Sequence, residues 1–164
     1  MKFTPGQLRS VTSISQETYR HWKKSFPDLE KNSGKKACFS AGDLLAVLII
    51  RQLTQGFKIQ VSALSGLSQR LFSLVNSTPW FNLERSVLLV NLPDNTLEMV
   101  SATAPFTPSQ SILVLPLAES TIAVRNSLLM DGQGETQGAL KFSPFKQTSL
   151  TNNNNSTSAQ AVVP

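Results

Sequence analysis

The chain has 164 residues, of which 40% are hydrophobic and 15% are charged. That length suits one domain of ordinary size and excludes a large multidomain enzyme, and the composition is typical of a folded chain with polar loops. The longest apolar run, residues 44–50, is far shorter than the roughly 20 residues that cross a membrane. The first residues lack the apolar core of a secretion signal, and the single cysteine, Cys38, allows no internal disulfide. We therefore expect a cytoplasmic protein with no membrane partner.

The net charge of +5 is unevenly distributed along the chain. Residues 1–76 contain eleven lysines and arginines against four acidic residues, whereas the remainder contains four against six. A basic front half beside a slightly acidic back half favours an anionic partner for the front, above all nucleic acid. Charge alone discriminates weakly, because many folded domains carry such an excess.

Two helix starts lie within the first 25 residues. In Thr4-Pro5-Gly6-Gln7, Thr4 caps a first short helix and Gln7 can reach back to complete a capping box. Ser15 supplies a second N-cap, for a helix that extends to about Lys24. Two helices with so short a connection must cross, and the pattern is that of a helix-turn-helix.

The second helix has two unlike faces. Tyr19 and Trp22 share one face and are predicted to meet apolar residues of the first helix. The polar residues are directed largely outward: Gln16, Arg20, Lys23 and Lys24. This arrangement would present a basic helix face to a partner.

A loop and two further helices complete the front half. Residues 25–38 contain the turn Asn32-Ser33-Gly34 followed by Lys35 and Lys36, which resembles a small wing. Ser40 then caps a buried helix that ends before residue 56, and residues 61–75 form another amphipathic helix. Gly66 is expected to weaken or divide that last helix.

The pattern changes after residues 77–80. Residues 86–92 and 96–102 are strand candidates on either side of the turn Pro93-Asp94-Asn95, and 111–115 is a third. Residues 117–129 are ambiguous, with helix favoured over strand. The remaining predictions are a loop at 131–138 and a disordered polar tail at 151–164.

The sequence therefore predicts an α+β fold in three parts. Residues 1–76 form a winged helix-turn-helix domain of four helices, residues 77–150 a small mixed, strand-rich region, and residues 151–164 the tail. The strand-rich region can serve dimerisation, sense a ligand or simply pack against the helices, and the sequence leaves these roles open.

Five segments of the front half, spread over about residues 3–64, form a pattern of their own. In chain order they are Phe3-Thr4-Pro5-Gly6-Gln7-Leu8, Ser13-Ile14-Ser15-Gln16-Glu17-Thr18-Tyr19-Arg20-His21-Trp22-Lys23, Phe39-Ser40, Asp43-Leu44 and Gly56-Phe57-Lys58-Ile59. This pattern resembles the MerR-type winged helix-turn-helix proteins. The resemblance implies that the second helix enters the major groove of DNA while the wing contacts the sugar-phosphate backbone. The sequence departs from the family pattern at two places. Ala37-Cys38 precedes Phe39 where the family usually has an arginine before the aromatic residue, and Pro79 with the strand-like segments after it takes the place of the long dimerisation helix.

Several side chains are suited to those contacts. Arg20 can reach a phosphate or a guanine edge, and Gln16 lies at the N-terminal end of the helix, where base contacts are commonest. Thr18 and Tyr19 offer hydroxyls to phosphate oxygens. The lysines would add salt-sensitive phosphate contacts: Lys23, Lys24, Lys35 and Lys36. Arg20 is the residue on which the hypothesis mainly depends.

Enzyme functions are disfavoured, and we expect no cofactor. His21 has no acidic residue placed by sequence to orient it, Cys38 lies in no nucleophile signature, and no ligand cluster suggests a metal. The working hypothesis is a sequence-specific regulator of transcription that binds double-stranded DNA, with pairing of two copies on a near-palindromic site. The alternatives are an excisionase-like accessory factor that bends DNA and a protein-interaction adaptor.

Overall fold

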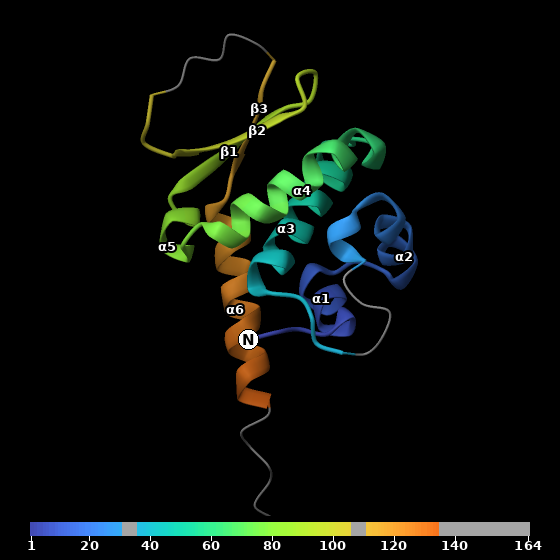
Figure 1. Ribbon diagram of the computed structural model, residues 1–164. Helices are drawn as coiled ribbons and strands as arrows, with labels where there is room; N and C mark the ends of the chain where they lie inside the picture. Colours follow the sequence, from blue (N-terminus) through green and yellow to red (C-terminus); the bar gives the residue numbers. More distant parts are fainter. Residues whose placement is uncertain (31–35, 106–110, 135–164) are drawn as a thin grey trace, which may run out of the picture.

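The structure, a computed structural model, describes residues 1–30, 36–105 and 111–134. Within these ranges the predicted α+β class is confirmed: six helices lie mainly in the first part of the chain and a three-stranded antiparallel sheet in the second (Figure 1). The elements are α1 (Pro5–Thr12), α2 (Gln16–Ser25), η1 (Pro27–Leu29), α3 (Ala41–Arg51), η2 (Gln52–Gly56), α4 (Val61–Ser77), α5 (Trp80–Leu83), β1 (Ser86–Asn91), β2 (Thr96–Ser101), β3 (Leu113–Pro116) and α6 (Ala118–Gly134). None of the helices in these ranges is both long and apolar enough to cross a membrane.

The predicted N-caps of α1 and α2 are confirmed. The Thr4 hydroxyl accepts a hydrogen bond from the Gln7 amide at 3.2 Å, and the Gln7 side chain accepts one from the Thr4 amide at 2.9 Å. The Ser15 hydroxyl caps α2 by accepting from the Thr18 amide at 3.0 Å. Between the helices, Ser13 has a left-handed backbone with φ of 51°, which turns the chain sharply.

Helix α3 forms the centre of the front half. Its sequence is apolar on almost every side, and eight of its eleven residues are buried. The Ser40 hydroxyl and the Asp43 carboxylate form a capping box at its start, as predicted. Asn76, at the end of α4, donates to the other Asp43 oxygen at 2.9 Å and accepts from the Ser40 hydroxyl at 2.6 Å. A side chain at Gly42 would collide with Asn76, so glycine permits this close approach of α4 to α3.

Helix α4 runs unbroken through Gly66, so the expected division at that residue is wrong. A Cβ atom at Gly66 would lie only 2.6 Å from the side-chain nitrogen of Asn95, in the turn between β1 and β2. A side chain at this position would require the exposed Asn95 side chain to move, so glycine allows the hairpin turn to approach the helix closely. Glycine within a helix costs about 1 kcal/mol relative to alanine.

The sheet has the strand order β2-β1-β3, with both neighbours antiparallel to β1. Leu88 of β1 pairs with Met99 of β2 and with Leu115 of β3, so these three side chains share one face. Leu88 and Leu115 are fully buried, and α4 packs against β2. The predicted turn at residues 93–95 is confirmed and is closed by hydrogen bonds between Asn91 and Asp94.

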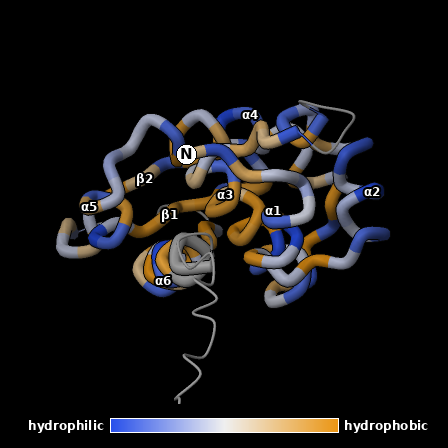
Figure 2. The backbone as a smooth tube through the Cα atoms, turned by 90° about the horizontal axis from the view of Figure 1, so that it is seen from below, coloured by the Kyte–Doolittle hydropathy of each residue, from blue (hydrophilic) through white to orange (hydrophobic). Residues whose placement is uncertain are grey.

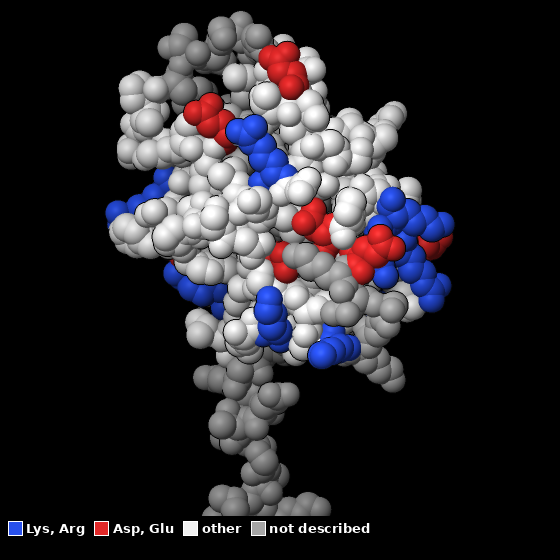
Figure 3. All heavy atoms as spheres, viewed as in Figure 1, with Lys and Arg blue, Asp and Glu red and all other residues white. Residues whose placement is uncertain are grey.

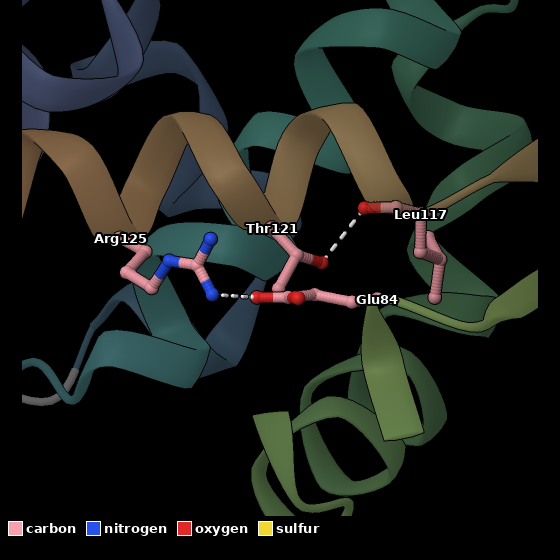
Figure 4. A network of polar contacts seen from close by, with 4 residues as sticks. All are labelled: Glu84, Leu117, Thr121 and Arg125. Atoms are coloured by element: carbon pink, nitrogen blue, oxygen red, sulfur yellow. Dashed lines mark hydrogen bonds and ion pairs between the residues drawn. The ribbon is translucent and has the colours of Figure 1, made fainter. Parts of the chain in front are cut away.

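Helix α6 confirms the helical prediction for residues 117–129 but extends to Gly134. The predicted loop at 131–138 is therefore wrong for residues 131–134, whereas residues 135–138 and the predicted tail lie outside the described residues. Figure 4 shows how the helix is fixed at its start. The Thr121 hydroxyl donates to the Leu117 carbonyl at 2.7 Å, and Arg125 forms an ion pair with Glu84, which follows α5.

One hydrophobic core joins the two parts of the chain. It includes Leu8 and Trp22 from the first helices together with Leu88, Leu117 and Val124 from the strand-rich part. In Figure 2 the apolar segments of α3 and β1 lie in the interior, and the hydrophilic segments of α2 lie at one side. The boundary near residue 76 thus marks a change of secondary structure between parts that share a core.

Candidate nucleic-acid interface

The position of α2 is determined by its aromatic face. Tyr19 and Trp22 are its two buried residues, as the pattern predicted. The Tyr19 ring meets Phe39 edge to face at 6.5 Å, and the Trp22 ring meets Phe26 in the same manner at 6.0 Å. These contacts hold α2 on the core and leave its opposite face in solvent.

A hydrogen bond from α3 holds the turn between α1 and α2. The Arg51 guanidinium donates to the carbonyl of Thr12, the last residue of α1, at 3.0 Å. Within the turn itself, the Ile14 amide donates to the Arg9 carbonyl at 3.2 Å, and the Ile14 side chain is buried. The crossing of the first two helices is therefore supported by backbone, side-chain and core contacts.

Most of the predicted contact residues of α2 lie on the surface. Gln16, Arg20 and Lys24 are exposed, and Lys23 is half-buried. Thr18 is also half-buried, and its hydroxyl is within 2.9 Å of the Ser15 hydroxyl, so it helps to build the cap. Of the predicted wing lysines, Lys36 is exposed and Lys35 lies outside the described residues.

Tyr19 differs from the others. Only 7% of the residue is exposed, and its hydroxyl oxygen is buried without a hydrogen-bond partner among the described residues. Burial raises the pKa of this phenol, Cys38 raises it further, and Arg9 acts in the opposite direction. The Tyr19 hydroxyl, which was predicted to contact a phosphate, is thus buried in this structure, while Tyr19 also lines the cavity described next.

A cavity of about 650 Å³ lies between the start of α1 and the outer face of α2. Residues 4–6 and Arg9 form one wall, and Gln16, Arg20 and Lys23 are among the residues of the other. Among the described residues, three cationic side chains thus line one hollow and no carboxylate does. Figure 3 shows lysines and arginines gathered on the α2 side of the molecule, with acidic residues close by.

Arg9 is the member of this group that sequence reasoning missed. It lies on α1, and only the crossing of α1 and α2 brings it to the same cavity as Arg20 and Lys23. Its one sequence signal is its place in the last turn of α1, where a cation also interacts favourably with the helix dipole.

The segment before α3 is joined to the N-terminus of the chain. The Phe3 amide donates to the Phe39 carbonyl at 2.8 Å, and the Cys38 amide donates to the Phe3 carbonyl at 2.9 Å. Lys36 lies two residues before Cys38, where this bridge fixes the backbone. The predicted wing turn, residues 32–34, lies outside the described residues.

Residues 1–30, 36–105 and 111–134 contain no group of three or more histidine, cysteine or acidic residues that could hold a metal ion. His21 is exposed on α2, and Cys38 is half-buried beside the bridge to Phe3. Comparison of the chain with protein-family models, with curated proteins and with solved structures found no match.

Proposed function

We propose that this chain binds double-stranded DNA through the outer face of α2 and acts as a sequence-specific regulator of transcription of the MerR-like type. The cavity lined by Arg9, Arg20 and Lys23 carries the proposal. In the part of the chain that the structure describes, three cations and no carboxylate line this hollow, which creates a local positive potential that favours a phosphate backbone.

The dimensions of α2 support this function. Its ten residues span about 15 Å, and an α-helix of ordinary width enters the major groove of B-DNA. Gln16 and Arg20 lie four residues apart and are both exposed, so they share a face that can approach base edges. Arg20 is suited to a bidentate contact with guanine, whereas Lys23, Lys24 and Lys36 are suited to phosphates.

Duplex binding is tested by fluorescence anisotropy with labelled random DNA at several salt concentrations. We expect binding at low salt, with log Kd rising linearly with log salt because each neutralised phosphate releases counterions. On a DNA site selected for specific binding, Arg20→Gln should weaken binding about tenfold, the lower part of the range for loss of a good arginine contact. On random DNA the same substitution should reduce the salt slope by about 1.

The matched control is Arg85→Gln, which removes the same charge. Arg85 is exposed and follows α5, on the opposite side of the molecule from α2 (Figures 1 and 2). At about 0.1 M salt we expect less than a twofold change, because exposed charges separated by more than about 10 Å are then largely screened. Equal effects of the two substitutions would show that α2 is not the interface, and absence of binding at low salt would favour the adaptor function.

Selection of bound fragments from random DNA, followed by footprinting, separates the two DNA-binding functions. A regulator that binds as a pair of copies should protect one near-palindromic site with half-sites about one helical turn apart. An excisionase-like accessory factor should protect adjacent repeated sites and bend the DNA strongly.

A further inference from the structure

A second cavity, of about 370 Å³, lies between η2 and the first turns of α6. Arg51, Gln52 and Gln55 are on one wall, and Glu119 and Ser120 are on the other. This volume is near the lower limit of small-molecule sites, which begin at roughly 300 Å³. We propose that this cavity binds a small zwitterion of the size of an amino acid, and that the bound ligand is coupled to the helix-turn-helix through Arg51.

The backbone forms an unusual turn at this place. The Phe57 amide donates to the Gln52 carbonyl at 3.3 Å, so the last turn after α3 is π-helical. Turns of this kind are rare in proteins, and those that occur are often found at functional sites. Within residues 1–30, 36–105 and 111–134, the two walls are joined by a long hydrogen bond from the Ser120 hydroxyl to the Gln52 side chain at 3.3 Å. A ligand with stronger polar groups can compete with a bond of this length.

Arg51 has donors left for an anion. Its Nη1 donates to the Thr12 carbonyl at 3.0 Å, and its Nε donates to the Gln55 side chain at 2.9 Å. The remaining three N–H groups of the guanidinium have no partner among the described residues. The side chain is half-buried, where a charged hydrogen bond to a carboxylate is stronger than in open water.

Glu119 supplies the complementary charge. It is exposed in the first turn of α6, and its carboxylate has no hydrogen bond or ion pair among the described residues. Arg51 and Glu119 line the same cavity, yet they form no ion pair with each other. A ligand that carries both a carboxylate and an ammonium can bind between them, whereas a simple anion would be repelled by Glu119. Leu48 and Ala123 add apolar surface for a side chain.

Arg51 also connects this cavity to the proposed DNA-binding element. The guanidinium that faces the ligand also holds the Thr12 carbonyl, immediately before the turn into α2. A carboxylate on its free donors would fix the guanidinium and so strengthen its hold on the end of α1. This coupling rests on the proposed function, and we expect the ligand to raise DNA affinity by about fivefold or more.

The ligand site is tested without DNA, by calorimetric titration of the full chain with each of the proteinogenic L-amino acids. We expect saturable binding of at least one, with one ligand per chain. Acetylation of its amino group, or amidation of its carboxylate, should weaken binding at least tenfold because each removes one charge.

Two variants locate the site. Glu119→Gln keeps the shape of an exposed side chain and should weaken binding at least tenfold, and Gln55→Ala should weaken it less. The matched control, Glu98→Gln, changes an exposed carboxylate on β2 and should leave binding unchanged. Binding of no amino acid, or equal binding by Glu119→Gln and the parent chain, would overturn the site.

The coupling between the ligand cavity and the DNA-binding face is tested separately. The DNA affinity of the parent chain is measured with and without the amino acid that binds. An unchanged affinity would overturn the coupling while the ligand site stands. If the chain binds no DNA under any condition, the proposed function fails, and the calorimetric result still decides the ligand site.

Discussion

Helices α2 and α3 are of nearly equal length and both begin at a serine N-cap, yet most of α3 is buried and most of α2 is exposed or half-buried. Eight of the eleven residues of α3 are buried, against two of the ten in α2. Burial of apolar side chains is the main source of folding free energy, so substitutions in α3 and its partners should act on stability. Substitutions on the outer face of α2 should act on binding and leave stability almost unchanged.

The largest effect is expected at Asn76, which joins the start of α3 to the end of α4. Asn76→Ala would leave the buried Asp43 carboxylate without one of its hydrogen bonds and would open a space beside Gly42. Loss of a partner from a buried charged group costs about 2–4 kcal/mol of unfolding free energy. Urea denaturation followed by tryptophan fluorescence measures this loss.

Asn126→Ala is the control for that experiment. Asn126 is exposed on α6, and its removal should change stability by less than about 0.5 kcal/mol. If Asn76→Ala were as mild as Asn126→Ala, the contacts at the start of α3 would contribute little to the fold.

The second prediction concerns the exposed face of α2. Arg20→Gln should lower DNA affinity about tenfold, or about 1.4 kcal/mol, and change the unfolding free energy by less than about 0.5 kcal/mol. The outer face of α2 contributes no buried side chain, so the two measurements should separate. A variant that binds weakly because it is unstable would contradict the assignment of Arg20 to the interface.

The third prediction uses the single tyrosine of the chain. Burial raises the pKa of Tyr19, so the native fold favours the neutral phenol over the phenolate. Above pH of about 10, the ordinary tyrosine value, the unfolded chain loses this proton while the native chain keeps it. The stability contributed by Tyr19 is therefore present below that pH and is lost as pH rises through the native pKa.

Ultraviolet absorbance of the phenolate reports Tyr19 alone. The native chain should titrate at a higher pH than the chain in urea, and Tyr19→Phe should remove the signal together with that part of the alkaline loss of stability. Equal titration midpoints in the two states would show that the hydroxyl is open to water and accessible to a phosphate.

The smallest effect is expected at Arg125, which joins α6 to Glu84. Half of the Arg125 side chain is exposed, and exposed ion pairs contribute about 0.5 kcal/mol. Arg125→Ala should lower the unfolding free energy by no more than about 1 kcal/mol, and added salt should reduce the difference from the parent chain. A larger loss, independent of salt, would mean that packing rather than charge holds the helix there.

Local patterns in the sequence determined most of the secondary structure. The caps at Thr4, Ser15 and Ser40 and the turn at residues 93–95 depend on side chains within three or four residues of one another. The spacing of Tyr19 and Trp22 likewise identified the buried face of α2. Such patterns are visible in a sequence because they need no knowledge of the path of the chain.

Contacts between distant segments were decided only by the tertiary structure. The crossing of α1 and α2 brings Arg9 to the cavity of Arg20, and the packing of α6 beside η2 brings Glu119 to that of Arg51. The fold likewise brings Gly66 of α4 close to Asn95, in a hairpin turn some thirty residues away. Residue spacing specifies which side of an element a side chain occupies, but a neighbour from elsewhere in the chain is specified only when the whole core has packed.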